Sequence, residues 1–265
     1  MKGRVLIVAG SDSGGGAGIQ ADIKAVTAMG GFAATAITAL TAQNTMGVHG
    51  VVPVDPAFIA QQIEVVLTDI GADAVKTGML HSAEVIVAVV AAAKKLARGV
   101  PLVVDPVMVA KGGHRLLEGA AEAALREQLL PMAALLTPNL PEAEALAGFP
   151  VRVEADMRRA ADRLLALGAK AVLMKGGHLE GDRVIDLLVQ DGRVDRFEDA
   201  RIPSRSTHGT GCTLASAIAA GLAQTMNLVD AVARARSYVR KAIETAPGYG
   251  QGHGPLNHAV TFKAG

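Results

Sequence analysis

The chain has 265 residues, of which 50% are hydrophobic and 19% are charged. A chain of this length and composition can bury a large core, so we expect one α/β domain over residues 1–265. A formal net charge of +1 and an aromatic content of 3% argue against a surface that binds nucleic acid. The single cysteine excludes an internal disulfide and a multi-cysteine metal site, and it fits a reducing compartment.

The apolar runs of the sequence are too short for a signal peptide or a membrane-spanning helix. The first covers only residues 5–9, and the longest, residues 85–93, would cross about half of a bilayer. We therefore expect a cytoplasmic protein that binds neither nucleic acid nor membranes.

In chain order, short buried strands alternate with helices. Strands are expected at residues 5–9, 32–42, 48–54, 72–76, 102–104, 134–136 and 171–174. Helices are expected at residues 19–29, 56–67, 82–97, 118–129, 154–167, 211–224 and 228–245. Asp191-Gly192 indicates an antiparallel edge hairpin between residues 184–190 and 194–197. This alternation predicts a doubly wound, mostly parallel sheet.

Polar and glycine-rich segments follow six of the expected strands. They begin after Ala9, Ala42, Lys76, Val104, Leu136 and Met174. The first, residues 10–18, is expected to be an irregular loop because it is rich in glycine. Ligands bind beyond the carboxyl ends of the strands in sheets of this type. The sequence therefore predicts a ligand site at this edge, with candidate hinges at Gly112-Gly113 and Gly176-Gly177.

The segment from Ser206 to Thr213 leads directly into an apolar helix pattern. The first amides of a helix lack partners within it and carry partial positive charge, and Gly209 and Gly211 would let an anion approach them. Taken alone, the segment is explained more simply as an ordinary turn with a buried Cys212.

Common nucleotide and metal signatures do not occur in the sequence. It contains no GxxxxGK[ST], no complete GxGxxG, no HExxH and no CxxC. The groups at the strand ends nevertheless suit phosphoryl transfer, which needs cations on the phosphates and carboxylates for a divalent metal. Lys175 and Asp105 end buried strands, while Asn139 and Glu142 face one point across a helix start. Each also has a structural explanation, as a solvated lysine, a turn residue or a helix cap.

Seven runs of residues, in a fixed order, point to one family. They are residues 9–22, 38–45, 75–80, 105–108, 137–143, 175–178 and 208–212. With these runs the chain resembles the hydroxymethylpyrimidine/phosphomethylpyrimidine kinases of thiamine biosynthesis, in the ribokinase-like superfamily. The resemblance covers nearly the whole chain. It implies a central, mostly parallel sheet with helices on both faces and a small β flap, and a homodimer.

The resemblance also implies a reaction and a substrate pocket. ATP would phosphorylate the hydroxymethyl group of 4-amino-5-hydroxymethyl-2-methylpyrimidine, and then the monophosphate to the diphosphate. Gln43 matches the pyrimidine-binding glutamine, whose amide offers both a donor and an acceptor. Four further positions match residues that line the substrate pocket: Gly10, Asp22, Met79 and Val107.

The remaining matches concern the phosphates. Lys175 matches the phosphate-binding lysine, and Asp105 and Glu142 fall where the superfamily organises Mg²⁺ and its waters. Asn139 shares that motif and is assigned, with Lys175, Thr210 and Gly211, to nucleotide binding. The turn Gly209-Thr210-Gly211 matches the anion hole for the transferred phosphoryl group.

Cys212 takes the place of the aspartate base found in most of the superfamily. A thiol titrates near ~8.5 in isolation and lower at a helix N-terminus beside cations. As a thiolate, Cys212 would accept the proton of the hydroxymethyl group; as a thiol, it would only orient that group. The second phosphorylation attacks with a phosphate oxygen and needs no strong base.

Two alternatives stay open. One is a pyridoxal or pyridoxine kinase of the same superfamily, although Gln43-Asn44-Thr45 and Met79 favour the pyrimidine. The other is a catalytically silent ligand-binding or regulatory protein, against which the intact Lys175, Asp105 and Glu142 argue.

Overall fold

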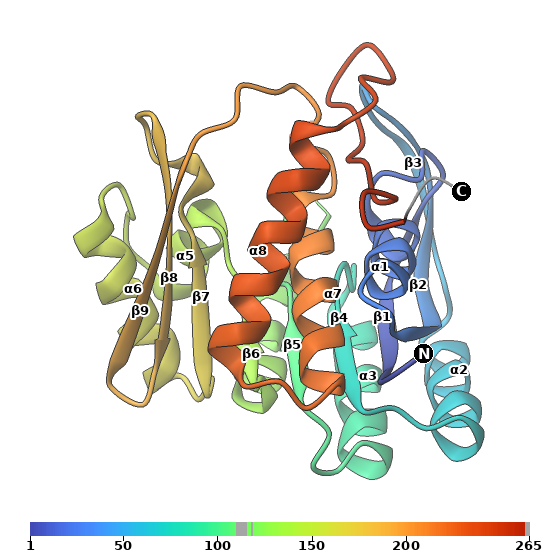
Figure 1. Ribbon diagram of the computed structural model, residues 1–265. Helices are drawn as coiled ribbons and strands as arrows, with labels where there is room; N and C mark the ends of the chain where they lie inside the picture. Colours follow the sequence, from blue (N-terminus) through green and yellow to red (C-terminus); the bar gives the residue numbers. More distant parts are fainter. Residues whose placement is uncertain (110–115, 118, 263–265) are drawn as a thin grey trace.

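A computed structural model describes residues 1–109, 116–117 and 119–262. Within these residues, nine strands form one sheet (Figure 1). The strands are β1 (Arg4–Asp12), β2 (Phe32–Asn44), β3 (Gly47–Pro53), β4 (Ala74–Thr77), β5 (Leu102–Val104), β6 (Leu135–Leu136), β7 (Ala171–Lys175), β8 (Arg183–Gln190) and β9 (Arg193–Ala200). The helices are α1 (Gly18–Ala28), α2 (Pro56–Asp69), α3 (Ala83–Leu96), α4 (Gly119–Ala124), α5 (Leu140–Ala147), α6 (Glu154–Ala166), α7 (Thr210–Ala223) and α8 (Leu228–Glu244), with short turns η1 (Leu125–Leu129), η2 (Leu130–Met132) and η3 (Gly176–His178).

The sheet is parallel in its centre and antiparallel at both edges. Its strand order is β3-β2-β1-β4-β5-β6-β7-β8-β9. The strands from β2 to β7 in this order pair in parallel, β3 runs antiparallel to β2, and β8 and β9 continue antiparallel at the other edge. The mostly parallel sheet and the edge hairpin around Asp191-Gly192 are thus confirmed.

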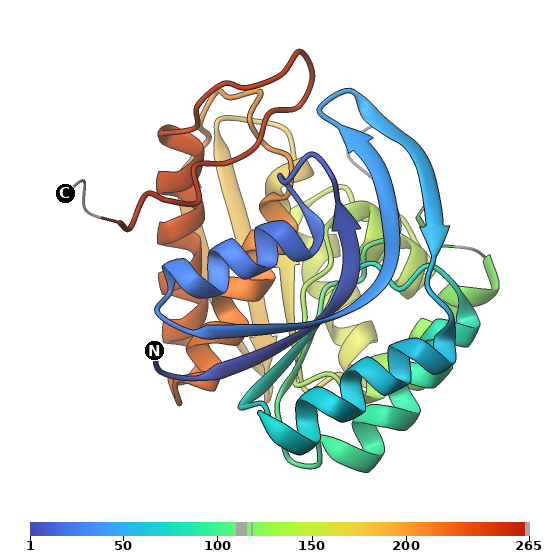
Figure 2. The same cartoon turned by 90° about the vertical axis from the view of Figure 1, so that its right-hand side faces the viewer.

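Helices cover both faces of the sheet (Figures 1 and 2). Successive strand residues point to opposite faces, so neighbours such as Leu6 and Ile7 enter different cores. One core packs β1 and β4–β8 against α2, α3, α5 and α6, and the other packs the same strands against α1, α7 and α8. Two helix starts follow directly from the sequence: Asp55 accepts hydrogen bonds from the amides that follow Pro56, and the Ser82 hydroxyl caps α3.

Two elements differ from the sequence-based expectation. Gly10, Ser11 and Asp12 continue β1 instead of starting a loop, because Ser11 and Asp12 pair with Leu40 and Thr41 of β2 beyond a bulge. The helix expected at 118–129 is a short α4 followed by the π turn η1 and the 3₁₀ turn η2. The candidate hinge Gly112-Gly113 lies outside the described residues. Among those described, no helix is both long and apolar enough to span a membrane.

Candidate active site

A cavity of about 840 Å³ opens at the carboxyl ends of β1, β4, β5 and β7. The sheet explains this location, because parallel strands end at one edge and the loops that follow them meet there. The cavity collects nearly all the residues singled out in the sequence. Its lining includes Gly10, Gln43, Met79, Asp105, Val107, Asn139, Glu142, Lys175, Gly209, Thr210, Gly211 and Cys212.

One cation and two carboxylates converge at the ends of β5 and β7. Lys175 Nζ lies 2.9 Å from Asp105 Oδ1 and 3.9 Å from Glu142 Oε2. Burial alone would raise the pKa of Asp105, but Lys175 and Lys76 outweigh it and hold that pKa below its usual range. Burial, with Asp105 nearby, raises the pKa of Glu142 to about 7. Of the two carboxylates, Glu142 is therefore the more easily protonated.

Asn139 and Glu142 form the helix cap that their spacing allows, and they also reach the cavity. Asn139 Oδ1 accepts a hydrogen bond of 2.9 Å from the Glu142 amide, and Glu142 Oε2 accepts one of 2.8 Å from the Asn139 amide. The capping box fixes the Glu142 carboxylate beside Lys175. The structural and functional explanations of this pair are thus compatible.

The turn before α7 lies close to this cluster. Gly209 has φ +76°, and a Cβ there would collide with the carbonyl oxygen of Gly16. A Cβ on Gly211 would lie 3.1 Å from Lys175 Nζ, so this backbone faces the lysine closely. The Thr210 hydroxyl donates to the Thr207 carbonyl at 2.7 Å, which steadies the turn. A helix N-terminus beside a lysine suits an anion such as phosphate.

The thiol of Cys212 does not behave as the sequence suggested. Part of this residue faces the cavity, yet burial of the thiol raises its pKa to about 12. Asp22 and Asp105 raise this pKa further, and Lys76 only partly opposes them. A helix N-terminus was expected to lower this pKa, but burial raises it, which favours the thiol among the two forms that the sequence left open.

Asp22 also departs from its expected place. Its carboxylate is fully buried, does not line the cavity, and pairs with the equally buried Lys76 through two contacts of 2.9 Å. The Ser216 hydroxyl donates to the same carboxylate at 2.7 Å. Lys76, which the sequence analysis did not single out, does line the cavity. A lysine in an apolar strand was the available signal, because buried charges require partners.

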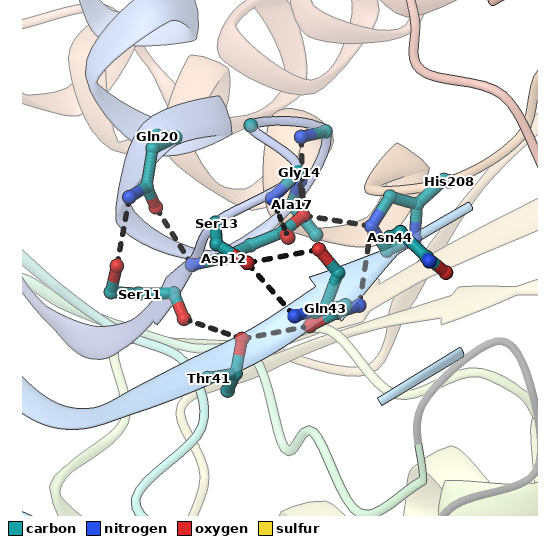
Figure 3. Close-up of polar contacts among 12 residues, drawn as sticks. Ser11, Asp12, Ser13, Gly14, Ala17, Gln20, Thr41, Gln43, Asn44 and His208 are labelled. Atoms are coloured by element: carbon teal, nitrogen blue, oxygen red, sulfur yellow. Dashed lines mark hydrogen bonds and ion pairs between the residues drawn. The ribbon is translucent and has the colours of Figure 1, made fainter. Parts of the chain in front are cut away.

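A second cluster of polar residues, which the sequence analysis did not predict, surrounds Gln43 (Figure 3). His208 Nε2 lies 2.8 Å from Asp12 Oδ2 and 3.3 Å from Gln43 Nε2. Thr41 Oγ1 lies 3.2 Å from Gln43 Oε1. Asp12 and His208 are 196 residues apart in the chain, and only the meeting of the two glycine turns brings them together.

The donor set fits Mg²⁺ that arrives with a nucleotide. In the described part of the chain, no three His, Cys, Asp or Glu side chains form a group that could hold a metal by themselves. Mg²⁺ is commonly bound by one or two carboxylates together with substrate phosphates and water. Asp105 and Glu142 supply such carboxylates beside the phosphate-suited turn.

Comparison with protein families gives a match over most of the chain. A family model described as phosphomethylpyrimidine kinase matches residues 12–257. The bifunctional thiamine biosynthesis protein ThiED of Geobacter sulfurreducens is 54% identical over 99% of this chain, which spans only 53% of that protein's length. The hydroxymethylpyrimidine/phosphomethylpyrimidine kinase of Rhizobium meliloti is 46% identical, with 96% of each chain covered.

Solved structures of two kinds of kinase share the fold. A phosphomethylpyrimidine kinase from Clostridium difficile is 43% identical, with a TM-score of 0.81, over 91% of this chain and all of its own. A pyridoxal kinase from Bacillus subtilis in an ADP complex is 34% identical, with a TM-score of 0.90 over 98% of each chain. The expected ribokinase-like α/β fold is thus confirmed.

Proposed function

The chain belongs to the phosphomethylpyrimidine kinase family, and we propose that it phosphorylates 4-amino-5-hydroxymethyl-2-methylpyrimidine and then its monophosphate. It is a kinase of thiamine biosynthesis that uses ATP. The observation that carries the assignment is the cluster of Lys175, Asp105 and Glu142 against the glycine turn before α7. One cavity holds this cluster together with Gln43, which supports a site that takes both a ring and a phosphate chain.

In the proposed reaction, the hydroxymethyl oxygen attacks the γ-phosphorus of ATP. A bond forms from this oxygen to phosphorus while the bond to the bridging oxygen of ADP breaks, and the hydroxyl proton passes to an oxygen of the transferred phosphoryl group. The amides of the Gly209–Gly211 turn and the Lys175 ammonium stabilise the negative charge of the transferred group. Gln43 holds the pyrimidine edge, and Gly10, Met79 and Val107 form the wall of the ring pocket.

Cys212 is proposed to orient the hydroxyl group. Since burial raises its pKa to about 12, Cys212 carries its proton at neutral pH and accepts none from the substrate in that state. A loose transition state places little demand on a base, because the charge develops on the transferred phosphoryl group. The second phosphorylation has a phosphate nucleophile and depends still less on the thiol.

The carboxylates of Asp105 and Glu142 would hold Mg²⁺, in part through water. The ion neutralises phosphate charge when it is bound. Asp22 is proposed to act indirectly, because its carboxylate keeps Lys76 charged at the floor of the cavity. Asn139 fixes Glu142, and Thr210 fixes the turn before α7. A cytoplasmic homodimer completes the proposal, in keeping with the family resemblance.

Pyridoxal phosphorylation is the second candidate, because the Bacillus subtilis pyridoxal kinase has the same fold over 98% of each chain. The two activities are separated by kcat/KM for the pyrimidine alcohol and for pyridoxal, measured with Mg-ATP on one preparation. We expect the pyrimidine to be preferred, and a preference for pyridoxal would reassign the substrate. Absence of turnover with either alcohol would favour a silent ligand-binding protein.

A further inference from the structure

We propose that Thr41 and the Asp12–His208 pair hold the Gln43 side-chain amide in one orientation, with its oxygen toward His208 and its nitrogen toward Thr41. The proposal rests on the pyrimidine kinase function, in which Gln43 contacts the substrate ring. Thr41, Asp12 and His208 then act as positioning residues that set substrate specificity. Figure 3 shows the group and draws the amide in the opposite orientation.

Asp12 is an acceptor for every group around it. Its Oδ1 accepts a hydrogen bond of 2.8 Å from the Gly14 amide, and its Oδ2 accepts bonds of 3.1 and 2.8 Å from the amides of Gly16 and Ala17. The side chain is 2% exposed. Burial alone would raise the pKa of Asp12, but the hydrogen bonds from His208 and from these amides outweigh it and hold that pKa below its usual range, so Asp12 is ionised.

His208 must therefore donate to Asp12. Its Nε2 lies 2.8 Å from Asp12 Oδ2, and a carboxylate oxygen can only accept. The hydrogen is on Nε2 whether the ring is neutral or protonated. A Gln43 nitrogen 3.3 Å from Nε2 would thus place two donors face to face. An oxygen at the same place accepts a second, shared hydrogen bond from Nε2–H.

Thr41 leads independently to the same orientation. Its hydroxyl has one hydrogen, which is donated to the Ser11 carbonyl at 2.9 Å. In the drawn orientation, Gln43 Oε1 at 3.2 Å would need that same hydrogen. With the nitrogen there instead, the hydroxyl oxygen accepts from Gln43. Oxygen and nitrogen of an amide are nearly the same size, so hydrogen bonding decides their order. One rotation removes both conflicts.

The backbone of Gln43 is held as well. The Ser13 hydroxyl donates to the Gln43 carbonyl at 2.9 Å and accepts from the Gln43 amide at 2.8 Å. The ring of His208 packs against Gly16, where a Cβ would lie 2.5 Å from its Cδ2. The two partners of the side-chain amide thus come from different segments, Thr41 from β2 and His208 from the turn before α7, and each segment contacts the β1–α1 loop.

The fixed amide presents an ordered edge to the cavity. A free lone pair of Oε1 lies on the His208 side, and the second N–H of Nε2 lies on the Thr41 side. In the substrate, ring atom N3 is an acceptor, the 4-amino group is a donor, and the hydroxymethyl group follows on C5. Pairing N3 with the amide nitrogen and the 4-amino group with the oxygen places C5 and its hydroxymethyl group on the His208 side, and His208 directly precedes the Gly209–Cys212 turn in the chain. The orientation thus agrees with the proposed place of phosphoryl transfer.

A suitable probe reverses the substrate's hydrogen-bond pattern. In 5-hydroxymethyl-2-methylpyrimidin-4-one, the 4-position is an acceptor and N3–H is a donor. A glutamine whose side-chain amide rotates freely would bind both the amino and the oxo substrate. The fixed amide, in contrast, places its N–H against N3–H of the analogue and its oxygen against the 4-oxo oxygen, so neither pair can form a hydrogen bond. Leaving such groups unpaired lowers kcat/KM for the oxo analogue about 10- to 100-fold relative to the amino substrate.

The test measures the ratio of kcat/KM for the two alcohols with Mg-ATP, in the intact chain and in two variants. Thr41→Val removes the hydroxyl at nearly constant volume, and Thr41→Ser keeps it. We expect Thr41→Val to reduce the discrimination at least about fivefold, while Thr41→Ser retains it. Each ratio is internal to one protein, so partial unfolding cancels.

An intact chain that uses both alcohols equally well would overturn the fixed amide. Equal discrimination by the intact chain and Thr41→Val would overturn the proposed role of Thr41 in holding the amide. Absence of turnover with the amino substrate itself would instead contradict the proposed function, so the two failures are distinguishable.

Discussion

Replacing Lys76 with Met tests the claim that a buried ion pair supports the floor of the active site. Both side chains of the Lys76–Asp22 pair are 0% exposed, and Lys76 Nζ lies 2.9 Å from each Asp22 oxygen. Burial disfavours the ammonium, but Asp22 and other nearby negative groups outweigh this and raise the pKa of Lys76. Lys76→Met leaves Asp22 with the Ser216 hydroxyl as its remaining side-chain donor.

The expected loss in the free energy of unfolding follows from the Asp22 carboxylate, which Lys76→Met leaves without its cationic partner. Removing one partner of a buried pair costs about 3–5 kcal/mol, because the other charge stays desolvated. Adding Asp22→Asn removes that charge at constant shape, and we expect the double variant to recover about half of the loss. Lys95 and Glu64 form a matched exposed pair at 3.1 Å, with side chains 69% and 51% exposed. Lys95→Met should cost at most about 1 kcal/mol.

Urea unfolding at pH 7, followed by circular dichroism, gives the free energy of unfolding for all four proteins. The reasoning predicts a large loss for Lys76→Met, partial recovery with Asp22→Asn and little change for Lys95→Met. A Lys76→Met loss no larger than that of Lys95→Met would refute it. So would a double variant that is less stable than Lys76→Met alone.

Three further predictions follow from the site and its surroundings. Cys212→Ala should slow the first phosphorylation about tenfold and the second phosphorylation less, because the thiol orients the hydroxyl group. The two steps are assayed separately, and a loss above about 100-fold in the first step would restore a general-base role for Cys212. Burial lowers the pKa of His258 to about 4 from 6.5, so the unfolded chain binds its proton more tightly, and His258 alone should cause a loss of about 2 kcal/mol of stability as the pH falls from 8 to 5. His258→Gln should flatten that loss in urea titrations at both pH values, and an unchanged slope would contradict the assignment. Gly209→Ala should lower both Tm and kinase activity, because φ is +76° and its Cβ would meet the Gly16 carbonyl; wild-type values in calorimetry and in the kinase assay would disprove this steric role.

The layout of the sheet and the phosphate end of the site could be predicted from the sequence. Because parallel strands end at one edge of the sheet, the sequence predicts that Asp105 and Lys175 lie at the same edge, and the two side chains are 2.9 Å apart there. The Asn139–Glu142 cap was predicted because its hydrogen bonds are local. Patterns confined to a few residues, or fixed by strand direction, need no knowledge of distant packing.

The missed features depend on contacts between distant segments. The pairing of Asp12 with His208 requires the two glycine turns to meet, and neither turn encodes that meeting locally. The extension of β1 through Asp12 depends on its pairing with Thr41 of β2. The Cys212 pKa was expected to fall at a helix N-terminus, but burial outweighs that effect and depends on the whole surrounding fold.

The central claim is tested most directly by incubating the chain with Mg-ATP and 4-amino-5-hydroxymethyl-2-methylpyrimidine and following both products by ³¹P NMR. The monophosphate should appear first and the diphosphate should follow, with ADP formed in proportion to the phosphoryl groups transferred. No phosphorylated pyrimidine from a chain that unfolds cooperatively would contradict the account.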